Sequence, residues 1–233
     1  MSNFHYVGSE LDLFAEARNW KAYWSQQINS FVCGDVLEVG AGIGSNTVLM
    51  CEGTNGRWIC LEPDPALASQ LEQSLKGREQ LQSLCGTLQT LVRRESFDTI
   101  LYVDVLEHIE DDVAEMKEAA ARLRPKGRII VLSPAHQWLF TPFDASIGHF
   151  RRYNRSTLKR VSPPGLVLEQ MFYLDSCGIA ASTANQLLLK QSMPTRKQIG
   201  IWDRWMIPVS KAMDPILGYS LGKSIVGIWR RPA

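Results

Sequence analysis

The sequence lacks the features that mark several large classes of protein. Its 233 residues carry 25 basic and 24 acidic side chains, so there is no charge excess of the kind that nucleic-acid-binding proteins use. The longest uncharged run in the C-terminal part, 176–189, is too short and too polar to span a bilayer. Repeats and low-complexity tracts are also absent. The length suits one globular domain of ordinary apolar content, with no nucleic-acid partner and no transmembrane segment.

The cysteines exclude a disulfide framework. They are odd in number, form no CxxC pair and stand mostly in apolar surroundings, so we expect free buried thiols in a reducing compartment, the cytoplasm. The first residues, MSNFHYVGSE, have neither the basic region nor the apolar region of a signal peptide, which supports the same expectation. The five are Cys33, Cys51, Cys60, Cys85 and Cys177.

The most informative stretch is 36–47, VLEVGAGIGSNT. An apolar run leads into three glycines, and a polar cluster then opens a helical pattern, which predicts a buried strand, a glycine turn and a helix start. Glycines allow the tight turn and let a ligand lie against backbone N–H groups. The spacing is not the dinucleotide fingerprint G-x-G-x-x-G, because the third glycine, Gly44, comes one residue early and Ser45 follows it. An ordinary strand-to-helix turn is the alternative.

An acidic residue follows at a spacing suited to a ribose ligand. Residues 57–62, RWICLE, predict a second strand that ends on Glu62, 18 positions after Gly44. A carboxylate at this strand end can accept hydrogen bonds from both hydroxyls of an adenosine ribose. A helix cap or a solvated loop acid is the alternative for Glu62. Asp64 suits a cap better, because Pro65 begins a helical pattern.

Strand and helix patterns alternate along the rest of the chain. This alternation predicts a doubly wound α/β sheet of mostly parallel strands with right-handed crossovers. The remaining expected strands are 81–84, 97–103, 128–132, 166–174 and 224–230, and the expected helices are 67–75, 113–123, 156–161 and most of 176–215.

The strand 97–103 runs into D-V-L-E-H-I at 104–109. Taken in order, E-x-G-x-G-x-G at 38–44, Glu62 and this run resemble the motifs of class I S-adenosylmethionine (SAM)-dependent methyltransferases, in particular the ubiquinone- and menaquinone-type group and a bacterial subgroup of unassigned substrate. The resemblance covers 36–132 closely and the remainder only by topology. It implies a seven-stranded Rossmann-like sheet whose last strand inserts antiparallel beside the fifth.

The resemblance also implies the activity, which is methyl transfer from SAM to an oxygen, nitrogen or carbon atom of a small-molecule acceptor, with S-adenosylhomocysteine as product. No acid follows the third expected strand, so adenine contact there would fall to Thr87 or to backbone. The implied cofactor-binding residues are Glu38, Gly40, Gly42, Gly44, Asn46, Glu62, Pro63, Thr87, Asp104 and Val105.

The segment after the fifth expected strand is rich in histidine, arginine and aromatic residues: SPAHQWLF at 133–140 and GHFRRY at 148–153. Loops at the carboxyl ends of strands often carry function in open α/β sheets. The candidates for a general base, in order, are His149, His136 and His108. The candidates for contact with a polar or anionic acceptor are Arg151, Arg152 and Tyr153. A loop tied by ion pairs between Asp144 and arginine, with a buried histidine, is the alternative.

Residues 1–34 show helical spacing with a heavy aromatic load. A helix packed on the core explains most of them, and a lid over a cofactor pocket is the second interpretation. The lid residues would be Tyr6, Arg18, Asn19 and Tyr23. We therefore expect one domain with a helical lid at 1–34, a SAM-binding core at 35–132, and substrate-side loops, a helical insertion and final strands at 133–233.

Two other functions remain open at this point. A SAM-binding regulator without turnover would share every cofactor motif. A nicotinamide-dependent oxidoreductase is disfavoured by the early third glycine. A nucleic-acid acceptor is disfavoured by the balanced charge and by the lack of an N-P-P-Y-type tetrad after the fourth strand.

Overall fold

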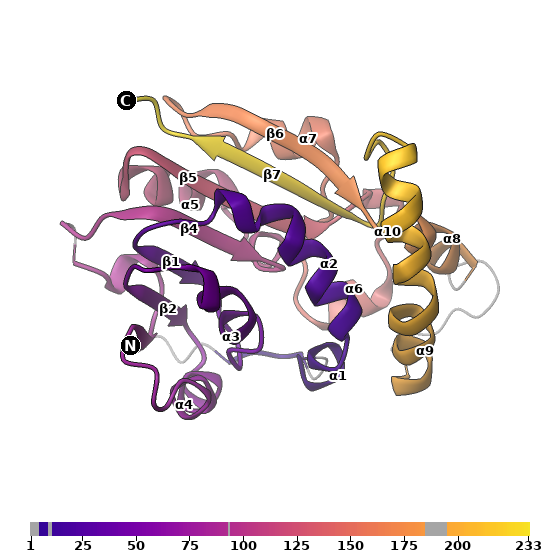
Figure 1. Cartoon of the computed structure of the whole chain (residues 1–233), viewed down its shortest axis with the longest axis horizontal. Coiled ribbons are helices and arrows are strands. Elements are labelled where there is room, and N and C mark those ends of the chain that lie inside the picture. Colours follow the sequence, from indigo (N-terminus) through magenta and orange to yellow (C-terminus); the bar gives the residue numbers. More distant parts are fainter. Residues whose placement is uncertain (1–4, 9–10, 93, 185–194) are drawn as a thin grey trace.

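The computed structural model of the chain describes residues 5–8, 11–92, 94–184 and 195–233. Within them a seven-stranded sheet runs in the order β3-β2-β1-β4-β5-β7-β6 (Figure 1). The first five strands pair in parallel, and β7 pairs antiparallel with both β5 and β6. The predicted doubly wound sheet, with its last strand antiparallel beside the fifth, is confirmed.

The strands are β1 (Val36–Val39), β2 (Trp58–Glu62), β3 (Leu81–Cys85), β4 (Phe97–Val103), β5 (Leu123–Pro134), β6 (Val167–Leu174) and β7 (Ser224–Arg230). The α-helices are α1 (Leu11–Ala15), α2 (Arg18–Ile28), α3 (Thr47–Met50), α4 (Pro65–Ser74), α5 (Asp112–Ala121), α6 (Pro142–Ser146), α7 (Arg155–Arg160), α8 (Ser176–Ala184), α9 (Arg196–Ile201) and α10 (Ile207–Ile216). Short turns of helix that bear on the site are η2 (Cys51–Gly53), η4 (Leu106–His108) and the π-helical η7 (Trp202–Met206).

The sequence prediction of β5, 128–132, is too short. The strand extends to Pro134 because its last residues pair with Ser224 and Ile225 of β7, a partner that the local apolar run at 128–132 does not reveal. After the glycine turn the chain makes only one short α-helix, α3, before it tightens into η2.

The core lies on both faces of the sheet. Successive residues of β1 point to opposite sides, so that Val36 joins the cluster around Trp24 and Trp58 while Leu37 joins the cluster around Tyr102. Because β1 and β2 are buried along their whole length, both read as unbroken apolar runs apart from one glutamate each.

The helix α2 packs its aromatic face on the core, as the helical spacing predicts. Trp20, Tyr23, Trp24 and Ile28 are all buried. The Tyr23 hydroxyl donates a hydrogen bond to Asp214 of α10 at 2.7 Å, although 191 positions separate the two residues. In Figure 1 the helices α8, α9 and α10 stand together at one end of the sheet. The helix α2 runs toward this group and contacts α10 and η7.

Two buried aspartates tie these helices to the end of β6. Asp214 also accepts hydrogen bonds from the backbone N–H groups of Asp175 and Ser176, at 2.8 and 3.0 Å. The Asp175 carboxylate accepts from Trp202 Nε1 and from Ser210 Oγ, each at 2.8 Å. The buried charges are therefore matched by donors from four elements.

The expectation of buried free thiols is borne out only in part. All five cysteines are free thiols, but Cys33 and Cys85 are exposed rather than buried. Among the described residues, the structure contains no helix that is long and apolar enough to cross a membrane.

We expect Tyr23→Phe to lower the free energy of unfolding by about 1–3 kcal/mol, because it removes a donor from the buried Asp214 carboxylate. Urea denaturation measures the change. The matched control is Tyr219→Phe, which keeps the ring contact with Phe172 and should change stability by less than about 0.5 kcal/mol. Equal effects of the two substitutions would contradict the role given to the Tyr23 hydroxyl.

Candidate functional site

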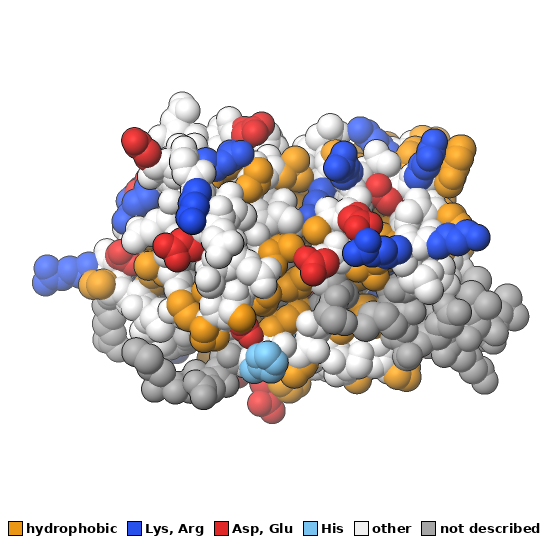
Figure 2. Space-filling view, turned by 90° about the horizontal axis from the view of Figure 1, so that it is seen from below, with side chains coloured by type: hydrophobic (Ala, Val, Ile, Leu, Met, Phe, Trp, Pro, Cys, Tyr) orange, Lys and Arg blue, Asp and Glu red, His pale blue; other side chains and the backbone are white. Residues whose placement is uncertain are grey.

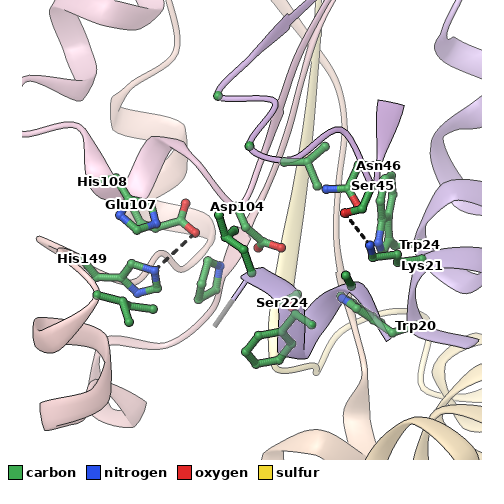
Figure 3. A pocket seen from close by; sticks show the side chains of 18 of the residues that line it. Trp20, Lys21, Trp24, Ser45, Asn46, Asp104, Glu107, His108, His149 and Ser224 are labelled. Atoms are coloured by element: carbon green, nitrogen blue, oxygen red, sulfur yellow. Dashed lines mark hydrogen bonds and ion pairs between the residues drawn. The ribbon is translucent and has the colours of Figure 1, made fainter. Parts of the chain in front are cut away.

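A cavity of about 200 Å³ lies beyond the carboxyl ends of β1, β4 and β5. This edge of a parallel sheet is where ligands bind in open α/β folds. Figure 3 shows its arrangement: His108, Glu107 and His149 stand on one wall, Trp20, Lys21, Trp24, Ser45 and Asn46 stand on the other, and Asp104 lies between them.

The three glycines of the turn after β1 have different structural roles. All have positive φ, and a Cβ atom on Gly40 would come within 2.7 Å of the Val105 side chain. A Cβ on Gly44 would come within 2.8 Å of Leu71. Gly42 faces the cavity, where a Cβ would meet only Leu11, at 3.8 Å. The outer two glycines therefore let the turn pack, while Gly42 leaves backbone open to a ligand.

Glu62 holds the glycine turn from the end of β2. One carboxylate oxygen accepts a hydrogen bond from the N–H of Gly42 and the other from the N–H of Asp64, both at 2.9 Å. The side chain is buried, and burial raises its pKa. Glu62 stands behind the turn and does not itself line the cavity. Asp64 caps α4, as predicted.

Glu38 supports the same turn from inside the sheet. Its carboxylate accepts from Thr47 Oγ1 at 2.7 Å and from Trp58 Nε1 at 3.1 Å. Burial raises the pKa of Glu38 to about 7, against the opposing effect of these two hydrogen bonds and of the Lys21 charge. The residue thus connects α3 to β1 and β2 below the cavity floor.

The wall formed by α2 and the turn carries one cation. Lys21 Nζ donates to Ser45 Oγ at 2.7 Å, and burial lowers the pKa of Lys21 to about 8 while Asp104 and Glu38 oppose that shift. Asn46 lines the cavity beside it, and its buried Oδ1 has no hydrogen-bond partner among the described residues. A buried amide oxygen without a donor is a position that a ligand can satisfy.

Asp104 stands at the centre of the cavity, at the end of β4. Its backbone has φ 55°, a left-handed conformation that is uncommon for a non-glycine residue. The side chain is open to the cavity but surrounded by protein, and this burial raises its pKa to about 6. Four cationic groups oppose the shift: His149, Lys223, Lys21 and Arg152.

The opposite wall is built around the buried carboxylate of Asp144. Arg152 donates to its two oxygens through Nε and Nη2, at 2.8 and 2.9 Å. His149 Nδ1 lies 2.9 Å from the same carboxylate, and His149 Nε2 lies 3.9 Å from Glu107 Oε1. Burial lowers the pKa of His149, but the carboxyl groups of Asp144 and Glu107 raise it more. Burial raises the pKa of Asp144, but the contacts with His149 and Arg152 hold it well below its usual range.

Glu107 and His108 of η4 complete this wall. Glu107 is fully buried and accepts from Ser133 Oγ at 2.9 Å. Burial, reinforced by the Asp104 charge, raises the pKa of Glu107 to about 8. The His108 ring lies 4.5 Å from that of His149, and burial together with the charge on His149 lowers the pKa of His108 to about 3. His108 is therefore a neutral imidazole at physiological pH.

The structure brings together only part of the set predicted from sequence. The predicted residues that line the cavity are Tyr6, Gly40, Gly42, Asn46, Asp104, His108, His149 and Arg152. The predicted residues that do not line it are Glu38, Gly44, Glu62, Pro63, Thr87, Val105, Arg18, Tyr23, His136, Arg151 and Tyr153.

Several of the second group are engaged elsewhere. Tyr153 donates to Asp112 at 2.7 Å, and Arg151 forms an ion pair with the same carboxylate. His136 stacks on Tyr173 with ring centroids 5.0 Å apart. Thr87 is exposed and contacts Gln89. Both interpretations of the segment 133–153, an acceptor-binding loop and a loop tied by ion pairs, are therefore partly met. The segment contains an ion pair between Asp144 and Arg152, and it places His149 at the cavity.

The segment 5–8 lies across the cleft. The Tyr6 N–H donates to Asp64 at 2.8 Å, its ring lies 5.8 Å from that of His108, and it lines the cavity. The segment therefore bridges the ends of β2 and β4, which is consistent with the lid interpretation of the N-terminal residues.

Sequence reasoning missed three charged residues at the cavity: Lys21, Glu107 and Lys223. Lys21 follows Arg18 by three positions, so both were equally available as the cation of α2, and only the packing of the helix decides between them. Glu107 belongs to the recognised D-V-L-E-H-I run, but its inward orientation depends on η4. Lys223 had no local signal.

Comparison with known proteins agrees with this geometry. Residues 37–131 match the family model described as a methyltransferase domain. This stretch holds the glycine turn, Glu62 and the D-V-L-E-H-I run. The ubiquinone biosynthesis O-methyltransferase of Bradyrhizobium diazoefficiens is 29% identical over 107 residues, 44% of this chain and 41% of that protein. That of Idiomarina loihiensis is 32% identical over 97 residues, 40% of each chain. The match thus spans about two fifths of these curated relatives.

Solved structures share the fold. Phosphoethanolamine N-methyltransferase 2 of Haemonchus contortus, solved in complex with SAM, has a TM-score of 0.65 at 12% identity, covering 97% of this chain and 58% of that one. The N-methyltransferase NodS of Bradyrhizobium japonicum has a TM-score of 0.58 at 13% identity, covering 96% and 99%. The [4+2]-cyclase SpnF has a TM-score of 0.62 at 14% identity. At these identities the likeness concerns fold alone, and function depends on the site.

The cavity predicts two very different imidazoles. In an NMR titration, His149 should bind its proton with a pKa above the ordinary value of about 6.5, whereas His108 should stay neutral down to about pH 3. Asp144→Asn removes the carboxylate that stabilises the His149 cation, so it should lower the pKa of His149. The control, Asp111→Asn in the exposed cap of α5, should change neither titration. An unchanged His149 pKa in Asp144→Asn would show that the contact is not electrostatically important.

The same shift predicts how stability depends on pH. Because folding raises the pKa of His149, its protonated form stabilises the folded protein below the unfolded-state pKa of about 6.5, and this contribution is lost as pH rises through the folded-state value. The unfolding free energy lost in His149→Gln should therefore be larger at about pH 6 than at about pH 9. Denaturation of both proteins at the two pH values measures it. A larger loss at the higher pH would contradict the direction of the shift.

Proposed function

We propose that this protein transfers the methyl group of SAM to a hydroxyl group of a small-molecule acceptor. The observation that carries the proposal is the pairing of Asp144 with His149 at the cavity wall opposite Lys21 and Asn46. One wall thus offers groups for a charged cofactor and the other offers a base for a protonated acceptor. The methyltransferase domain and the names of the relatives support the same reaction class.

The residues present fit SAM. Glu62 holds the glycine turn from behind through the N–H groups of Gly42 and Asp64, and Gly42 leaves room for a ligand at the turn. The Lys21 ammonium suits the carboxylate of the methionine moiety. The unpartnered Asn46 Oδ1 and the Asp104 carboxylate suit its positive charges.

When bound, SAM supplies a methyl group made electrophilic by its sulfonium. The chain would then align the acceptor for in-line attack and exclude water. Asp144 fixes the His149 tautomer with the proton on Nδ1, which leaves Nε2 as the acceptor of the hydroxyl proton. Neutral His108 lies beside His149 and can orient the acceptor by a hydrogen bond without adding charge.

The cavity favours an acceptor with an apolar body. Its walls include many apolar side chains, among them Leu11, Phe14, Trp20, Phe143, Ile147 and Trp202. The arginines expected to bind an anion are engaged elsewhere, since Arg152 pairs with Asp144 and Arg151 with Asp112. We therefore favour a hydroxylated, largely apolar acceptor over an anionic one. The exposed free thiols Cys33 and Cys85 suit a reducing compartment, the cytoplasm.

Calorimetric titration tests the cofactor. The protein should bind SAM and S-adenosylhomocysteine saturably, and Glu62→Ala or Lys21→Met should each weaken binding by about tenfold or more, or about 1.4 kcal/mol. Exposed neighbours serve as matched controls, so Glu72→Ala on α4 and Lys76→Met after it should bind as the unmodified protein does. Absence of binding by the folded protein would exclude the proposal.

Turnover tests the base. With a panel of hydroxylated aromatic acceptors, His149→Gln should lower kcat by about 10²–10⁴-fold while the dissociation constant for SAM stays unchanged. His136→Gln is the control, because that ring lies outside the cavity, and it should leave kcat unchanged. Retained turnover in His149→Gln would remove the assigned base. Tight SAM binding without turnover of any acceptor would favour a regulatory SAM-binding protein instead.

A further inference from the structure

Exposed apolar side chains concentrate on the C-terminal helices. In the part of the chain that the structure describes, fourteen large apolar side chains are exposed, and seven of them lie between 201 and 221. Trp205 is 65% exposed and Ile216 is 76% exposed. Scattered exposed apolar residues need no explanation, but a concentration on one element marks an interaction surface.

These side chains lie on one face. Ile201, Trp205, Val209 and Met213 follow one another at intervals of four residues through α9, η7 and α10. On a regular α-helix such a row drifts around the axis by about 40° per step, and the wider π-helical turn of η7 offsets part of this drift. The opposite face is buried and includes Ile199, Trp202, Ile207, Ser210 and Asp214. The helical segment therefore carries a second apolar row that faces solvent, opposite its buried face.

The charges of this segment are sorted in the same way. Its two acids are buried and paired: Asp203 accepts the N–H groups of Asn19 and Trp20, and Asp214 accepts the Tyr23 hydroxyl. Its cations are exposed, and Lys197 and Arg204 flank the apolar row, with the Arg204 guanidinium 5.6 Å from the Trp205 ring. Figure 2 shows basic and apolar side chains side by side at this end of the molecule. The exposed surface of α9, η7 and α10 thus carries positive charge only.

We propose that this outer face, comprising Lys197, Ile201, Arg204, Trp205, Val209, Met213 and Ile216, binds the anionic surface of a lipid bilayer. An apolar stripe with an aromatic residue and flanking cations inserts at the headgroup level, where the apolar side chains leave water and the cations meet lipid phosphate. A second copy of the chain suits the face less well, because α9, η7 and α10 carry no exposed acid, and the exposed acid beside them, Glu16, already pairs with Arg196.

The position of the face gives this contact a meaning for the cavity. Trp202 lines the cavity, and Trp205 points outward from the same π-helical turn. The cavity therefore lies within about one helix diameter, 10–12 Å, of the proposed bilayer surface. This consequence depends on the proposed function, since it would bring an apolar acceptor dissolved in the bilayer close to the site. The membrane contact itself does not depend on methyl transfer.

Vesicle co-sedimentation tests the contact with the full chain and without SAM. The protein should sediment with vesicles of equal parts phosphatidylcholine and phosphatidylglycerol, and much less with phosphatidylcholine alone. The double variants Ile201→Ser/Trp205→Ser and Lys197→Glu/Arg204→Glu should each lower the partition coefficient by about tenfold or more. The matched control is Val113→Ser/Lys117→Glu, which makes the same types of change on the exposed face of α5 and should partition as the unmodified protein does.

Trp205 provides a second readout. Vesicles containing a brominated phosphatidylcholine should quench the tryptophan fluorescence, and Trp205→Phe should remove most of the quenching while it retains most of the binding. Calorimetry with SAM on the same variants reports separately on the cofactor site. Loss of membrane binding with unchanged SAM affinity would therefore show that the membrane contact and the proposed cofactor site are separate.

Three outcomes would overturn the proposal: no sedimentation with anionic vesicles, equal sedimentation of the face variants and the control, or quenching that persists in Trp205→Phe. Light scattering tests the remaining occupant. A dimer that becomes a monomer in Ile201→Ser/Trp205→Ser would assign the face to contact between copies of this chain instead.

Discussion

The cavity wall after β5 depends on one buried carboxylate, that of Asp144. Asp144 has almost no contact with solvent, yet it remains ionised because Arg152 donates a hydrogen bond to each of its oxygens and His149 adds a third contact. Removing any one partner would leave a charge without compensation in a poorly solvated place, which is costly. The long connection between β5 and α7 is thereby fixed, and the imidazole that faces the cavity has a set orientation.

The cavity as a whole is electrically balanced rather than strongly charged. Lys21, Lys223 and Arg152 oppose Asp104, and His149 opposes Glu107. The two acids still carry raised pKa values, because burial acts on them more strongly than their cationic neighbours do. Such an arrangement surrounds a charged ligand with fixed groups of both signs and needs little reorganisation on binding. Its apolar walls reinforce these interactions by excluding water.

The sequence predicts what depends on local patterns. The bounds of β4 and β7 follow from apolar runs with clear limits, and the glycine turn, Asp64 and the alternation of elements follow from backbone chemistry. The site is predicted less fully, because a helical residue reaches the cavity only if its helix is rotated correctly. Tyr23 was a plausible site residue until its hydroxyl was seen to bind Asp214, a partner that no local pattern reveals. Likewise, a balanced overall charge hides the sorting of acids and cations in α9–α10.

The pair of buried aspartates at the end of β6 has a consequence for the modularity of the fold. Asp175 and Asp214 connect α8, η7 and α10 to one another, and Tyr23 and Trp20 connect this group to α2. The helical insertion is therefore not an independent appendage on the sheet. A chimera that exchanges 176–216 with another chain's segment would leave the α2 donors without acceptors unless α2 is exchanged with it, so the two segments constitute one unit for recombination and engineering.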